Sequence, residues 1–211
     1  MGDAEQDHQS DADFGYGLAS NGDGRIADSL NDGTHGMNPR APVVTVIPMV
    51  FELLPDLHPD LNPLMWLVGN WHGNGHVEYP EIEKQTFEQD VIFHHDSRPF
   101  LHYFSQTWLT DDDGNRVGPG EQETGFLRAT GGDQIDLVLS LHTGYAHDLH
   151  GQLDGPRMTY VTKWLARPET EPDYTEQRMY GLVQGDLMYA IDRETGGHPM
   201  QSYAWGQLAR V

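Results

Sequence analysis

The feature that most constrains the fold is an alternating run at residues 69–75, which reads GNWHGNG. Successive side chains of a β-strand point to opposite faces, so one face of this strand would carry a single indole among glycines and the other only polar groups. The first face comprises Gly69, Trp71, Gly73 and Gly75. This pattern is typical of the first strand of a small β-barrel, in which the indole closes one end while the glycines let the strand bend and leave interior space. A glycine-rich loop is the alternative, and a phosphate-binding loop is disfavoured because no GK[ST] motif or helical pattern follows.

Short strand-like runs continue from Leu67 to the C-terminus and are separated by turn sequences. The turns lie at residues 111–115 (DDDGN), 131–133 (GGD), 154–156 (DGP), 184–186 (QGD) and 195–197 (TGG). Several of them are short enough for antiparallel hairpins. About ten runs of this kind predict an all-β fold, an antiparallel up-and-down β-barrel, and argue against a helical bundle.

The composition divides the chain into three parts. Residues 1–40 are rich in Asp, Gly, Ser and Asn and almost free of large aliphatic side chains, which predicts a disordered acidic N-terminal tail. Residues 41–66 are more apolar, and a helical turn is expected at about Pro59–Leu67 with Pro63 in its first turn. We interpret residues 41–66 as a lid or plug against the barrel end, and residues 67–211 as the barrel.

The GxWxGxG form of the opening run closely resembles the signature of the nitrobindin family, small barrels of the lipocalin and fatty-acid-binding-protein-like kind. The resemblance extends in collinear order over roughly residues 64–211. The further matching segments are 77–82 (VEYPEI), 98–101 (RPFL), 106–108 (QTW) and 123–128 (ETGFLR). The chain most resembles the actinobacterial branch called ferric-nitrobindin-like proteins.

This resemblance implies a site for haem b, which nitrobindins hold through one proximal histidine on the last strand. Matched by the preceding proline–hydrophobe pair at 199–200, the corresponding residue here is Tyr203. His198 lies five positions earlier, so in a regular strand it would face the other side. We therefore expect that functional haem is lost and that no cofactor is bound. The alternative is that Tyr203 ligates haem iron, which requires a nearby cation such as Arg178 to stabilise the phenolate.

Two pairs of residues are candidates for contact with an interior ligand. Tyr203 and Trp205 share the bulky face of the last strand, which we interpret as the interior face. Arg178 and Tyr180 also share a face, and could together clamp a carboxylate or another anion. A salt bridge from Arg178 to an acid on an adjacent strand, or packing of Arg178 on an aromatic ring, is equally compatible with the sequence.

The chain contains twelve histidines, six of which lie in two groups. These are His94, His95 and His102 in one hairpin, and His142, His147 and His150 in another. No HExxH motif or carboxylate-bracketed triad occurs, so we expect solvated strand and turn histidines and no metal site. No Ser-His-Asp or Cys-His arrangement can be picked out either, and we assign no catalytic residue.

Composition limits the partners and the compartment. A formal net charge of −21 repels phosphate backbones and anionic membrane surfaces, so neither nucleic acid nor membrane is an expected partner. No apolar run reaches the ~18 residues of a membrane span, and the N-terminus lacks the layout of a signal peptide. The absence of cysteine excludes disulfides and fits a reducing compartment, so we expect a cytoplasmic protein.

These observations favour a non-enzymatic barrel that encloses a small apolar or amphipathic ligand. The alternative is a ferric haem b protein that handles nitric oxide or isomerises peroxynitrite, with Tyr203 as the axial ligand. A third possibility is a structural or partner-binding barrel whose interior is filled. The sequence indicates neither the ligand nor the oligomeric state.

Overall fold

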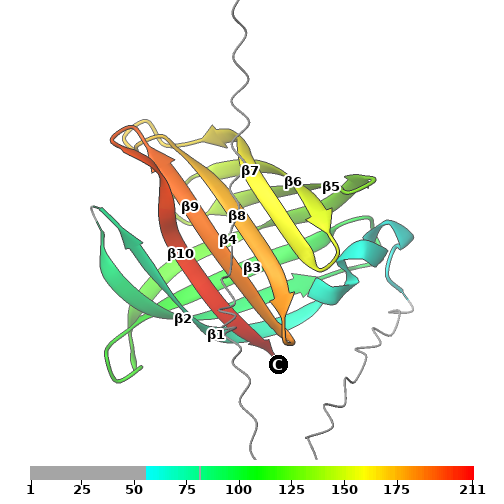
Figure 1. Cartoon of the computed structure of the whole chain (residues 1–211), viewed down its shortest axis with the longest axis horizontal. Helices are drawn as coiled ribbons and strands as arrows, with labels where there is room; N and C mark the ends of the chain where they lie inside the picture. The colour runs from blue at the N-terminus through cyan, green and yellow to red at the C-terminus, as the bar shows by residue number, and fades with distance from the viewer. Residues whose placement is uncertain (1–55, 81) are drawn as a thin grey trace, which may run out of the picture. The chain divides into compact units, whose positions relative to one another are not determined.

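A computed structural model describes residues 56–80 and 82–211. In this part of the chain ten strands form one closed barrel, in which consecutive strands pair antiparallel and the last strand pairs with the first (Figure 1). The strands are β1 (Gly69–Tyr79), β2 (Ile82–His94), β3 (Leu101–Thr110), β4 (Arg116–Gly131), β5 (Gln134–Leu141), β6 (Ala146–Asp154), β7 (Arg157–Ala166), β8 (Tyr174–Val183), β9 (Asp186–Thr195) and β10 (His198–Arg210). The predicted up-and-down barrel is confirmed. The predicted acidic tail lies outside the described residues, and the domain boundaries at 40 and 66 stay predictions.

Each predicted turn joins two consecutive strands. Glycine is required where the backbone turns into the left-handed region, as at Gly155 with φ 56° and Gly185 with φ 98°. Consecutive connections alternate between the two ends of the barrel, because every strand runs opposite to the one before it.

A short helix, η1 (Pro59–Leu67), precedes the barrel and closes one end of it. It is a 3-10 helix with Pro59 at its start, whereas Pro63 lies inside it and not in the first turn as expected. Leu61, Leu64 and Leu67 are fully buried in the same apolar core as the strand residues. The expected helical turn is therefore present and packs its apolar side into the barrel core, while the role of residues 41–66 as a lid or plug stays a prediction.

The glycines of the signature strand β1 lie where neighbouring groups leave no room for a side chain. Trp71 is 1% exposed, and its indole Nε1 donates a hydrogen bond to the carbonyl oxygen of Leu67, 2.8 Å away. A Cβ atom on Gly73 would lie 2.1 Å from the carbonyl oxygen of Gln207, and one on Gly75 would lie 2.6 Å from the Phe87 ring. Both distances are below van der Waals contact, so the glycines permit close approach of β10 and of an interior ring.

Strand β10 departs from regular alternation at Tyr203. The pairing with β9 shifts between Ser202 and Ala204, so Tyr203 is the extra residue of a β-bulge. Tyr203 and Ala204 both line the interior, and from there Gly206 and Leu208 follow on the inner face.

The bulge overturns two expectations. Trp205 is 41% exposed on the outer surface, where its ring contacts His76 at 4.3 Å, so its placement on the interior face with Tyr203 is wrong. The parity argument that set His198 against Tyr203 also fails, because a second shift lies between His198 and Gln201. His198 and Tyr203 both pack edge-on against Tyr79, with ring centroids 5.7 Å and 6.0 Å away.

None of the helices formed by the described residues has the length and apolar character needed to cross a membrane.

Candidate ligand-binding site

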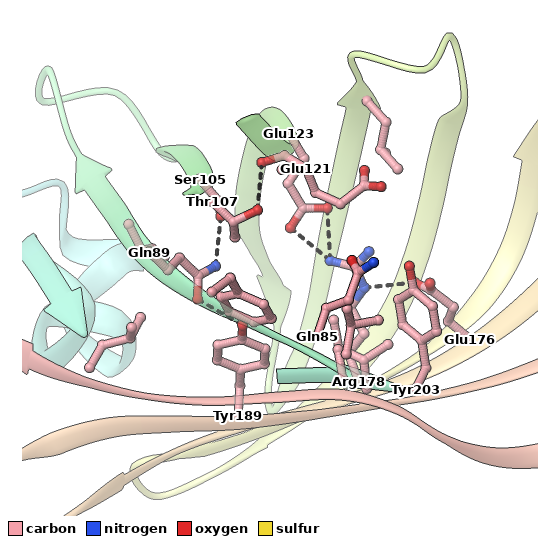
Figure 2. A pocket seen from close by; sticks show the side chains of 18 of the residues that line it. Gln85, Gln89, Ser105, Thr107, Glu121, Glu123, Glu176, Arg178, Tyr189 and Tyr203 are labelled. Carbon is pink, nitrogen blue, oxygen red and sulfur yellow. Dashed lines mark hydrogen bonds and ion pairs between the residues drawn. The ribbon is translucent and has the colours of Figure 1, made fainter. Parts of the chain in front are cut away.

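The barrel interior contains a cavity of about 330 Å³ (Figure 2). This volume lies at the lower end of the range typical of small-molecule sites, roughly 300–1,000 Å³. Its walls are largely apolar, with residues such as Val77, Val91 and Leu187 contributed by different strands. Polar side chains converge on the cavity in two clusters, one charged and one neutral. Such an arrangement suits a ligand that is apolar over most of its surface.

The charged cluster is an ion-pair network built on Glu176 of β8. Its carboxylate, 1% exposed as a residue, accepts hydrogen bonds from Arg178 Nε at 2.8 Å and Arg193 Nε at 3.0 Å. Arg178 Nη1 reaches the two carboxylate oxygens of Glu123 on β4 at 3.0 and 3.1 Å. Glu123 also accepts the hydroxyl proton of Tyr103 at 2.6 Å. The network thus links strands on different sides of the barrel (Figure 2).

Glu176 and Arg178 keep their charges because of the opposite charges beside them. Burial by itself would raise the pKa of Glu176, but the positive charges of Arg178 and Arg193 outweigh it and hold the pKa at about 2. Burial would lower the pKa of Arg178, but Glu123 and Glu176 raise it well above the ordinary value. Two carboxylates therefore neutralise two guanidinium groups.

This geometry bears on the predicted pair Arg178 and Tyr180. Both side chains are buried and line the cavity, so their shared inward face is confirmed. The guanidinium of Arg178 is already paired with Glu176 and Glu123, which favours the salt-bridge interpretation over a free anion clamp. The acids differ from those expected: Glu176 is on the same strand and Glu123 on a distant one. Direct contact of Arg178 or Tyr180 with a ligand stays a prediction.

Tyr203 lines the cavity beside this network. The guanidinium carbon of Arg193 lies 3.5 Å from the centroid of the Tyr203 ring and 4.2 Å from that of Tyr174. The cation next to Tyr203 is therefore Arg193, not Arg178 as the sequence analysis suggested. Burial raises the pKa of Tyr203 and Arg193 opposes this only in part, so the phenol is neutral near pH 7.

A second, neutral cluster was missed in the sequence. Gln89 of β2 donates from Nε2 to Ser105 Oγ of β3 at 2.8 Å, and accepts the Tyr189 hydroxyl of β9 at 2.7 Å. Gln89 and Ser105 are 5% and 3% exposed. The sequence did carry a signal for this cluster. Gln89 stands at an inward position of β2, between the apolar inward residues Phe87 and Val91.

One histidine contradicts the expectation of solvated side chains. His147 is 1% exposed, with Nε2 2.8 Å from Thr162 Oγ1 and Nδ1 3.6 Å from a Glu176 carboxylate oxygen. Burial lowers its pKa to about 4, so the ring is neutral. His150, by contrast, is a half-exposed partner of Asp136 at 2.6 Å. Among the described residues no group of three or more potential ligands is arranged to hold a metal ion.

Comparisons with known proteins identify the relatives of this barrel. The sequence model of a family described as "THAP4-like, heme-binding beta-barrel domain" matches residues 60–210. A protein of a Nocardioides species named "Peroxynitrite isomerase" is 42% identical over 163 residues, which cover 77% of this chain and 99% of that protein. A "Ferric nitrobindin-like protein" of Streptomyces griseus is 38% identical, over 77% of this chain and 87% of that protein.

A solved structure shares the fold. The crystal structure of Rv2717c from M. tuberculosis superposes with a TM-score of 0.66 at 27% sequence identity, covering 74% of this chain and 99% of that one. The expectation that the chain has no cofactor is contradicted by these comparisons. The matching family is described as heme-binding over residues 60–210 of this chain.

The donors around the cavity can be tested against haem. Tyr203, at the position where the family resemblance implied histidine, lines the cavity and offers a phenol oxygen, a known donor type to haem iron. His142 also lines the cavity, but its Nδ1 is occupied by the backbone N–H of Gln122 at 3.2 Å. Tyr203 is therefore the lining residue that would offer haem iron a donor, through its phenol oxygen.

The barrel topology, the buried signature Trp71 and the family match over residues 60–210 agree with one another. The chain belongs to the nitrobindin family of THAP4-like, heme-binding β-barrels.

Proposed function

We propose that this protein binds a small amphipathic ligand inside the barrel. The observation that carries the proposal is the cavity of about 330 Å³, whose apolar walls end in two sets of hydrogen-bonded polar side chains. Sites of this composition use the walls for affinity and the few polar groups for orientation. The ligand's polar end would lie toward Tyr203 and Glu121, where the lining is polar and partly open to solvent.

Haem is the ligand class that the family supports, and Tyr203 is the residue that would hold it here. When bound, haem supplies an iron centre with redox and oxygen-species chemistry. The protein's own contribution would be a phenolate oxygen at Tyr203, stabilised by the guanidinium of Arg193 over the ring. Glu176 holds that guanidinium in place by accepting a hydrogen bond from Arg193 Nε. Because the phenol is neutral near pH 7, the affinity for ferric haem would be lower than with a histidine.

Peroxynitrite isomerisation is a second candidate function. It is favoured by the 42% identity to the Nocardioides protein of that name over 99% of its length. For this chain the activity would depend on haem held through Tyr203. Measuring the rate of peroxynitrite decay with the hemin-loaded full chain, and with hemin alone, tests this candidate directly.

Native mass spectrometry of the full chain, purified from cells without added ligand, tests the binding function. The expected result is a small-molecule adduct that disappears on denaturation. Ala204→Leu should reduce the adduct, because Ala204 lines the cavity and a larger side chain would fill part of it. Unchanged circular dichroism would show that the barrel is retained. A bare protein mass, together with no binding of apolar probes to the purified chain, would indicate a filled interior and refute the proposal.

A further inference from the structure

The charges around the cavity do not balance. The lining includes the carboxylates of Glu121, Glu123 and Glu176, but only the guanidinium groups of Arg178 and Arg193. Both arginines are engaged with Glu123 and Glu176 in the network described above. Among the described residues this leaves Glu121 as the lining carboxylate without an arginine or lysine partner. It lies beside Glu123 at the edge of the cavity, with a side chain 57% exposed (Figure 2).

His142 does not neutralise Glu121. Its Nδ1 lies 3.6 Å from Glu121 Oε2, but the same nitrogen accepts a hydrogen bond from the backbone N–H of Gln122 at 3.2 Å. A ring nitrogen that accepts a hydrogen bond carries a lone pair, so this geometry assigns the ring proton to Nε2 and a neutral ring. The nitrogen nearest Glu121 thus presents electron density toward the carboxylate and no proton. The negative charge of Glu121 remains uncompensated.

The walls of the same cavity are rich in aromatic rings. Phe87, Tyr103, Tyr180, Tyr189 and Tyr203 all line the cavity. The faces of such rings attract cations, and desolvation strengthens the attraction. An aromatic enclosure with one free carboxylate at its edge is complementary to an alkylammonium group.

A ligand carboxylate meets the opposite situation. The positive charges of Arg178 and Arg193 are already offset by those of Glu123 and Glu176. A ligand carboxylate would therefore add a net negative charge to a largely buried site, which is unfavourable. The charge of Glu121 would add repulsion at the cavity edge.

We propose that the cavity prefers amphipathic ligands with an ammonium end over those with a carboxylate end, and that Glu121 is the residue that sets this preference. The inference deepens the proposed ligand-binding function and rests on it. It assigns to this barrel a charge selectivity opposite to that of a fatty-acid site, in which a cation is left free for the ligand.

Calorimetric titration of the full chain with three probes of one alkyl length tests the preference. Octylamine, octanol and nonanoate share an octyl chain and differ in the polar end, which is cationic, neutral and anionic at pH 7. We expect octylamine to bind about fivefold more tightly than nonanoate, with octanol between them, as for a contact with a half-exposed carboxylate. The difference should shrink at high salt, because Glu121 is half exposed and its field is screened.

Variants assign the effect to Glu121. Glu121→Gln should weaken octylamine binding about two- to fivefold and leave octanol binding unchanged. Asp133→Asn is the matched control, since it removes one exposed carboxylate from the β4–β5 turn and Asp133 does not line the cavity. It should leave all three affinities as they are.

The outcomes separate the inference from the function on which it rests. If octanol binds and nonanoate binds as tightly as octylamine, the charge preference is refuted while the ligand-binding function stands. If octylamine binding survives Glu121→Gln unchanged, the role of Glu121 is refuted. If none of the three probes binds, the proposed function fails and the inference falls with it.

Discussion

The two ends of the barrel interior are built on different physical principles. At the end closed by η1, Leu61, Leu64 and Leu67 pack with Trp71 in an apolar core that excludes water. Around Tyr203, the interior is held by buried charges that compensate one another across strands. The first end gains stability from area removed from water. The second gains little net stability from its ion pairs but depends on keeping every one of them, because an unpaired buried charge is strongly destabilising.

The sharpest test of this comparison is the removal of one charge from the network. Glu176→Gln leaves Arg178 and Arg193 with only one carboxylate between them, so we expect a loss of about 3–5 kcal/mol in the free energy of unfolding. Urea denaturation measures it. Asp136→Asn is the control, because it removes the carboxylate of a part-exposed pair with His150 and should change stability by less than about 1 kcal/mol. Equal losses in the two variants would mean that burial does not make the network more sensitive to the loss of a charge, which contradicts the comparison.

The closed end should respond to volume and not to charge. Leu64→Ala removes a fully buried side chain of η1 and should lower the free energy of unfolding by about 2–5 kcal/mol. The charged cluster should be unaffected, so the variant should lose the same free energy at pH 5 as at pH 8. A loss that changed strongly with pH would show that the two ends are coupled and that the contrast drawn above is wrong.

The charged end should also make stability depend on pH through His147. Its pKa is lowered from 6.5 to about 4 in the folded barrel, so between these values the unfolded chain binds the proton and the folded chain does not. Stability contributed by this group is therefore fully present above pH 6.5 and falls as pH drops toward 4. A shift of this size corresponds to about 3 kcal/mol.

His147→Gln should flatten this part of the stability profile, measured by urea denaturation from pH 4 to 8. His150→Gln is the matched control, since His150 is half exposed and lies on the outer side of the same strand. If the slope between pH 6.5 and 4 persists without His147, another group causes it.

The same contrast explains how far sequence reasoning reached. Strict alternation located the inward Trp71 and the shared face of Arg178 and Tyr180, because both lie in regular strands. The alternation failed at Trp205, because the bulge at Tyr203 moves every later side chain of β10 to the opposite face. No residue type near position 203 marks the bulge in the sequence. The pairing of Arg178 with Glu123 was also out of reach, since it joins residues 55 positions apart and depends on barrel closure. Burial of His147 had no signal in composition either.

Tyr203 gives the smallest expected effect, and it tests the charged end as a haem site. A neutral phenol must lose a proton to ligate ferric iron, and burial makes that loss harder even with Arg193 over the ring. An imidazole presents a nitrogen lone pair without this deprotonation. We therefore expect wild-type protein to bind hemin weakly, with a broad Soret band, and Tyr203→His to bind it about tenfold more tightly.

Tyr203→Phe removes the oxygen donor and should abolish the residual coordinated spectrum while leaving the fold intact by circular dichroism. A sharp Soret band in the unmutated chain, lost in Tyr203→Phe, would show instead that Arg193 stabilises the phenolate enough for tight ligation. A wild-type spectrum unchanged by Tyr203→Phe would remove Tyr203 from the haem site altogether.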